Sequence, residues 1–213
     1  MGWTRMGLAL AWCLFFSGWC VYPVVQAAEV STVEQTADDA AAREETSAPS
    51  REELLVQLRA HILAKYGRIA AREPIPMDCQ ALQQKSSRSY MEEYALYRWW
   101  REHGAWQKAL VSCEAARKES LAFDQRMGLR AESPAPYLTD KGELLVLLGR
   151  LPEAKATLGQ AAEHLANDHD HVLESPYLTV EDRQRLLDLR QDRLRELQDY
   201  VQQLTTILSQ EES

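Results

Sequence analysis

One stretch in the middle of the chain, residues 136–167, constrains the fold more than any other. Gly149 lies where a helix should end, because glycine readily adopts the left-handed conformation that closes a helix, and Pro152 lies where the next helix should begin. Small residues recur along the stretch, with leucines between them at helical spacing: Gly142, Leu145, Gly149, Leu151, Ala154, Leu158 and Ala161. The pattern predicts two helices joined by a turn of about three residues, in contact through their small side chains.

Small and large apolar residues at these spacings resemble the tetratricopeptide (TPR) repeat, a helix–turn–helix unit of about 34 residues. A second pair of helices resembles this repeat more weakly, through Leu96, Trp100, Gly104, Trp106, Ala109 and Ala116. It departs from the pattern at Tyr97, where the family has Gly or Ala, and at Cys113, which replaces a bulky aromatic residue. The resemblance implies an all-α, TPR-like helical repeat, a fragment of an α-solenoid, with units at about 90–124 and 137–167.

The helical domain is expected to span residues 50–210, with one additional helix before the repeat units. Ser50–Glu53 forms a capping box, in which the serine hydroxyl and the glutamate satisfy free amides at the start of a helix. Apolar residues then follow at helical spacing to about Arg72, and the two prolines of residues 73–76 end the helix. A second capping box, Ser89–Glu92, begins the first helix of the weaker repeat unit.

The last helix is predicted over residues 179–208 and carries an apolar seam. The seam residues alternate at spacings of three and four: Leu194, Leu197, Val201, Leu204 and Leu208. Two interpretations stay open: the helix covers the end of the repeat stack, as repeat proteins require, or part of it projects as a dimeric coiled coil. The charged residues of this helix are expected mostly on a solvated face: Glu181, Arg185, Asp188, Asp192 and Glu196.

The N-terminal segment predicts export. Arg5 precedes a nearly continuous apolar run, and small residues follow Pro23 where a signal peptidase would cut, so we expect a cleaved signal peptide at residues 1–27. The alternative is an uncleaved membrane anchor, because about 20 apolar residues also span a bilayer. Residues 28–49 are acidic and lack aromatic residues, which predicts a disordered linker. The domain would then be exported, and periplasmic if the source is bacterial.

The charge of the chain argues against two classes of partner. The formal net charge is −8 and the pI is about 5.2, without a cluster of Lys and Arg. Nucleic acids and anionic membrane surfaces are both bound through such clusters. We therefore expect no nucleic-acid partner, and no membrane partner after signal cleavage.

Two cysteines lie outside the signal peptide, Cys79 and Cys113. An even pair in an oxidising compartment suggests a disulfide. Such a bridge would close a loop of about 35 residues and stabilise the fold by on the order of 4 kcal/mol. The alternative is that both are small buried hydrophobic residues.

The sequence does not predict catalysis, a metal or a cofactor. It has no nucleophile elbow, no phosphate-binding glycine-rich loop and no zinc-protease motif. His164 and residues 168–171 form the one polar cluster with ligand-type side chains, and a polar loop after a helix explains it. We therefore expect a protein that is not an enzyme.

The TPR resemblance implies a function in binding proteins. First helices of the repeats line a groove that holds peptides or partner helices, so the resemblance places eight residues in the groove: Met91, Tyr94, Arg98, Arg101, Thr139, Glu143, Val146 and Arg183. Tyr and Arg are also frequent at the centres of interfaces; the alternative is that these are ordinary exposed residues. We expect a scaffold or adaptor in a cell-envelope or secretion assembly. The alternatives are an oligomeric envelope spacer assembled through the last helix and, third, an envelope enzyme.

Overall fold

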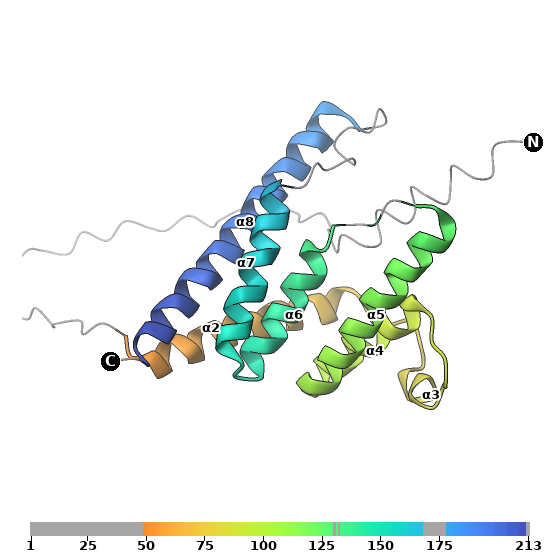
Figure 1. Cartoon of the computed structure of the whole chain (residues 1–213), viewed down its shortest axis with the longest axis horizontal. Helices are drawn as coiled ribbons and strands as arrows, with labels where there is room; N and C mark the ends of the chain where they lie inside the picture. The colour runs from red at the N-terminus through yellow and green to blue at the C-terminus, as the bar shows by residue number, and fades with distance from the viewer. Residues whose placement is uncertain (1–48, 130, 132, 168–177, 212–213) are drawn as a thin grey trace, which may run out of the picture. The chain divides into compact units, whose positions relative to one another are not determined.

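The computed structural model describes residues 49–129, 131, 133–167 and 178–211 (Figure 1). The predicted signal peptide and almost all of the predicted linker lie outside the described residues, as do Asp168, His169, Asp170 and His171. Within the described ranges the secondary structure is helical and contains no strand, which confirms the all-α class. Helix labels follow Figure 1, and the helices are α2 (Arg51–Arg72), α3 (Cys79–Gln83), α4 (Tyr90–Glu102), α5 (Trp106–Met127), α6 (Ala135–Leu147), α7 (Leu151–Asn167) and α8 (Val180–Ser209).

Both predicted capping boxes are confirmed. At the start of α2, Ser50 Oγ accepts from the Glu53 amide at 3.3 Å, and Glu53 Oε2 accepts from the Ser50 amide at 2.8 Å. The same reciprocal pair begins α4, at Ser89 and Glu92. The α2 helix ends at Arg72, directly before the proline-containing segment. The residues that determine these two helix starts therefore lie within four positions of one another in the sequence.

Two tight turns fold the central helices into hairpins. Gly104 between α4 and α5, and Gly149 between α6 and α7, have φ values of 68° and 76°. These are left-handed conformations that favour glycine. The α4 helix packs on α5 and α6 packs on α7, while α5 contacts α6 and α7 contacts α8. The five helices from α4 to α8 therefore lie side by side in chain order (Figure 1).

The α6 and α7 helices approach each other closely at Gly142 of α6. A Cβ atom built at Gly142 would lie 2.5 Å from Leu158 Cγ, so only glycine fits here without a shift of α7. Around this contact the two helices contribute a continuous set of buried apolar residues: Leu144, Leu145, Val146, Leu151, Ala154, Leu158 and Ala161. The small residues noted in the sequence are thus at the helix–helix contact.

The apolar seam of α8 faces the chain's own helices. Leu197 and Leu204 are buried in the main core, and Val201 and Leu208 pack against it. The α8 helix contacts α7 and α2, so it covers the end of the row of helices. In this position the seam is occupied within one chain and is not presented to a second copy. No helix in the described ranges is both long and apolar enough to cross a membrane.

Cys79 and Cys113 are free, buried thiols. Cys79 lies in a small cluster with Ala95 and Leu96, and its Sγ is 3.7 Å from the Ala95 carbonyl oxygen. Cys113 lies in the main core. Burial raises the pKa of both thiols. The disulfide suggested by the even cysteine count is not formed in this structure, because the two thiols belong to different apolar clusters.

Candidate helix-binding face

The α2 helix crosses the face made by the first helices of the row, α4, α6 and α8, and contacts all three. We call this surface the first-helix face. It is built by a repeated spacing, since Tyr94, Arg98 and Arg101 of α4 lie at i, i+4 and i+7, and so do Thr139, Glu143 and Val146 of α6. Residues at this spacing project from one side of a helix. The sequence therefore places six of the eight predicted groove residues on two matching stripes.

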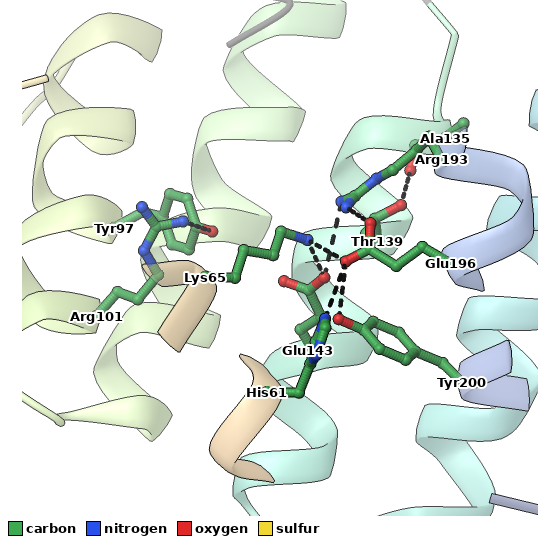
Figure 2. Close-up of polar contacts among 10 residues, drawn as sticks. All are labelled: His61, Lys65, Tyr97, Arg101, Ala135, Thr139, Glu143, Arg193, Glu196 and Tyr200. Carbon is green, nitrogen blue, oxygen red and sulfur yellow. Dashed lines mark hydrogen bonds and ion pairs between the residues drawn. The ribbon is translucent and has the colours of Figure 1, made fainter. Parts of the chain in front are cut away.

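An ion pair between α2 and α6 lies at the centre of the first-helix face. The Glu143 side chain is completely buried, and its Oε1 accepts a hydrogen bond from Lys65 Nζ of α2 (Figure 2). Arg193 Nη2 of α8 lies 3.7 Å from the same oxygen. A buried carboxylate must be paired to remain charged. Two cations from two other helices provide that compensation.

A second carboxylate, Glu196 of α8, joins the same network. It forms an ion pair with Arg193, its Oε1 lies 3.5 Å from Lys65 Nζ, and it accepts a hydrogen bond from the Tyr200 hydroxyl at 2.8 Å (Figure 2). Burial alone would raise the pKa of Glu196, but Arg193 and Lys65 outweigh burial and lower it. His61 Nε2 of α2 lies 3.9 Å from the same carboxylate. Of the five charged residues expected mostly on a solvated face, four are exposed, and Glu196 is half-buried because α2 brings Lys65 to it.

The third part of the face is the aromatic surrounding of Arg101 on α4. The guanidinium carbon of Arg101 lies 4.4 Å from the ring centre of Tyr66 on α2 and 5.1 Å from that of Tyr97. Its Nη1 donates to the Tyr97 hydroxyl at 2.8 Å. Arg101 is thus held by cation–π contacts with two rings, one of them supplied by α2.

Asp140 of α6 lies close to these charges. Burial raises the pKa of the Asp140 carboxyl, although Arg101 acts in the opposite direction. With Asp140 included, the face contributes three carboxylates, Asp140, Glu143 and Glu196, which lie among the cations Arg101 and Arg193 of the face and Lys65 of α2. The face and α2 are therefore matched in charge.

The end of α2 is fixed to α4 as well. Arg98 donates to the Glu73 backbone carbonyl, and its Nη1 lies 3.4 Å from Glu73 Oε2. Nearer the middle of α2, Arg59 Nε donates to the Val146 carbonyl at 3.3 Å. At its start, Arg51 pairs with Glu211 after α8, at 3.0 Å. Polar contacts thus hold α2 along its whole length.

The structure places the eight predicted groove residues in three environments. Arg98, Arg101, Glu143 and Val146 are buried and contact α2 or the residue that follows it through the interactions above. Thr139 is buried and donates to the Ala135 carbonyl, and half-buried Tyr94 lies 5.6 Å from Tyr97, ring centre to ring centre. Met91 and Arg183 are exposed, Met91 by 42%. Half of the predicted groove residues are therefore covered by α2 or by the residue that follows it.

Sequence reasoning did not identify the residues that complete the network, namely Lys65, Tyr66, Asp140, Arg193, Glu196 and Tyr200. One signal was present, because Lys65 and Tyr66 follow directly on the apolar stripe of Leu58 and Ile62 in α2. A lysine beside such a stripe is a candidate for a buried ion pair. Its partner could not be read from the same segment, since Glu143 is 78 residues away.

Comparisons with protein-family models, with curated proteins and with solved structures return no match for this chain. Function must therefore be argued from the face itself. In the described part of the chain, no group of three or more His, Cys, Asp and Glu residues is arranged to hold a metal ion. The first-helix face does hold a helix, α2, through apolar packing and paired charges.

Proposed function

We propose that this chain is an exported, non-enzymatic scaffold of TPR-like helical repeats that binds a peptide or partner helix through its first-helix face. One observation carries the proposal: this face already holds a helix, α2, by apolar anchors and matched charges. Helix-in-groove recognition uses the same elements, an apolar stripe at helical spacing with polar contacts that fix register. The resemblance of the two hairpins to TPR units supports the same function.

Export and the setting of the partner come from the N-terminal sequence. The predicted signal peptide at residues 1–27 and the acidic linker at 28–49 would place the helical domain outside the cytoplasm, in a cell-envelope or secretion assembly. The net charge of −8 favours a protein partner over nucleic acid. The oligomeric spacer is less favoured, since the α8 seam packs on the chain's own core.

The direct test is photo-crosslinking in the native host, with a photoreactive amino acid at one position at a time. Met91 and Arg183 are the exposed predicted groove residues, so both positions should capture the same protein. Val111 of α5 and Glu163 of α7 are exposed on second helices and are the matched controls. Equal capture from all four positions, or none from Met91 and Arg183, would refute the proposal. Charge reversal of Arg98 and Arg101 is a poor test, because both are buried under α2 and their loss would disturb the fold.

A further inference from the structure

The α2 helix is attached to the first-helix face along one side, where Leu54 and Leu55 pack against the core and Arg59 and Lys65 make polar contacts. Its buried residues are Leu58, Ile62 and Tyr66, spaced four apart. The opposite side of α2 is solvent-exposed, with Val56 exposed by 64% and Leu63 by 43%. One side of α2 therefore packs on the face, and the other side is exposed to solvent. A helical ligand in a groove has the same arrangement, with anchors at intervals of three and four residues.

The surface beneath α2 is compatible with an uncovered state. Leu58 and Ile62 pack in the main apolar core, and beside them, at Lys65 and Tyr66, the surface presents charged groups, above all Glu143, Arg101 and Arg193. Charged groups regain hydration when a covering helix leaves, whereas a purely apolar surface would only lose by exposure. The hairpins α4–α5 and α6–α7 also contact each other and α8 without α2. Departure of α2 thus uncovers a surface that is apolar under Leu58 and Ile62 and charged under Lys65 and Tyr66, on a row of helices that pack on one another.

Nor does α2 satisfy every group that it covers. Glu143 Oε2 and Arg101 Nε beneath α2, and the Tyr66 hydroxyl of α2 itself, are buried and have no hydrogen-bond partner in the described part of the protein. Buried polar atoms without partners weaken an interface. A helix that supplied a donor to Glu143 Oε2 or an acceptor to Arg101 Nε would satisfy groups that α2 leaves unpaired.

Covalent connection gives α2 an advantage over any free helix. Residues 73–89 join it to α4, so its effective concentration at the face is on the order of millimolar. A free helix must overcome this tether, and its apparent affinity falls by the fraction of chains in which the face is open. The tethered helix thereby sets a threshold for binding.

We propose that α2 is an intramolecular competitor of the partner helix. The partner helix carries the α2 anchors: two aliphatic residues four apart, as Leu58 and Ile62, then a cation three residues on and an aromatic residue directly after it, as Lys65 and Tyr66. This inference rests on the proposed function and specifies its ligand. The cation would pair with Glu143, and the aromatic ring would cover Arg101.

The experiment uses the full chain and a fluorescent peptide of residues 49–73, with binding followed by fluorescence anisotropy. Ile62→Asp removes a completely buried anchor and should release α2, so this chain should bind the peptide at least about tenfold more tightly than the wild-type chain. Val56→Asp adds the same charge to the exposed side of α2 and should leave peptide binding at the wild-type level. A peptide with Lys65→Glu, which faces Glu143 and Glu196 with a like charge, should bind at least about tenfold more weakly.

Circular dichroism shows whether the Ile62→Asp chain stays folded. If it loses helicity, recovery of the signal when the peptide is added supports the proposal, because the face then recognises α2 as a separate ligand. If the peptide neither binds nor restores helicity, or if Ile62→Asp and Val56→Asp behave alike, α2 is an integral part of the fold and the proposal is overturned. A dimer of the Ile62→Asp chain that excludes the peptide would also overturn it.

Failure of this inference is distinguishable from failure of the proposed function. If Met91 and Arg183 capture a partner but the peptide does not bind, the scaffold function is supported and the role of α2 as a competitor is refuted. Peptide binding without any captured partner would show that the face accepts α2 as a separate ligand, and it would remove the scaffold function.

Discussion

Lys65 of α2 and Glu143 of α6 form the ion pair that joins α2 to the middle of the row of helices α4 to α8. The carboxylate is fully buried and the lysine side chain is only 14% exposed, so neither charge is well solvated. Pairing compensates for the cost of burial but does not remove it, since desolvation offsets much of the attraction between buried charges. Such a pair fixes the position of α2 more than it raises the total stability.

Removal of one partner from this pair should therefore be more harmful than removal of both. We expect Lys65→Met to lower the free energy of unfolding by about 3 kcal/mol, at the lower end of the usual range because Arg193 stays near Glu143. The double variant Lys65→Met/Glu143→Leu should recover most of this loss. Urea denaturation of the single and double variants gives the coupling energy.

The control is an exposed pair of the same chemistry. Arg195 and Asp192 of α8 are 2.8 Å apart, with side chains that are 70% and 66% exposed. Arg195→Met should change the free energy of unfolding by less than about 0.5 kcal/mol. If the double variant at Lys65 and Glu143 were as unstable as the single one, the ion pair would not be the reason for the loss.

The contact of Gly142 with Leu158 gives a second prediction. Alanine in place of a mid-helix glycine ordinarily stabilises a helix by about 1 kcal/mol. At Gly142 the added methyl group would overlap Leu158, so Gly142→Ala should instead destabilise by about 1–3 kcal/mol. Gly159, in the facing helix, has nothing within 4 Å of an added Cβ, so Gly159→Ala should stabilise. Thermal unfolding of the two variants should show shifts of opposite sign, and a gain in both would mean that α6 and α7 are not this close.

Features encoded within a few residues could be predicted from the sequence. The capping boxes at Ser50 and Ser89 and the turn at Gly149 depend on backbone groups at most four residues away. The small residues of the 136–167 stretch likewise indicated a close helix pair, because only small side chains permit that approach. Local chemistry determines where these helices begin, end and touch.

The position of α2 could not be predicted in the same way. The stripe of Leu58 and Ile62 shows that α2 packs against something, but any apolar surface would satisfy it. Glu143 was expected to line an open groove because the TPR resemblance placed it among the groove residues. Glu143 is buried because Lys65, from a segment 78 residues away, pairs with its carboxylate and compensates the charge. The packing position of α2 is determined by pairs of residues from distant segments, so it cannot be predicted from the apolar stripe of α2 alone.

The two carboxylates with opposite pKa shifts give a third prediction, on pH dependence. The pKa of Glu196 is lowered, so the unfolded chain binds this proton more readily than the folded chain. Its stabilising contribution is then complete above the ordinary value of 4.5 and is lost as the pH falls through the folded value. Glu196→Gln should lower stability at pH 7, and its difference from the wild type should shrink below about pH 4.5. Urea denaturation from pH 7 to pH 3 measures this.

Asp140 is the internal control, because its pKa is raised. The folded chain binds this proton more readily, so the ionised carboxylate is unfavourable at neutral pH and becomes less so as the pH falls through its folded pKa. Asp140→Asn should therefore stabilise the protein at pH 7, with a gain that disappears towards pH 3.8, the ordinary value. If Asp140→Asn and Glu196→Gln changed the stability at pH 7 in the same direction, that result would contradict the arrangement of charges around α2.

The start of α4 supplies the last prediction. The pKa of Glu92 is lowered to about 2, first because Lys85 Nζ donates to it at 2.6 Å and next because the Ser89 amide donates to it. Glu53 at the start of α2 has the same capping box with Ser50, which lowers its pKa. Lys85→Met should therefore raise the pKa of Glu92 towards that of Glu53 and leave the Glu53 value unchanged. Carboxyl carbon shifts followed by NMR over a pH titration report both groups in one sample. An unchanged Glu92 value would mean that the cap, and not the lysine, controls this carboxylate.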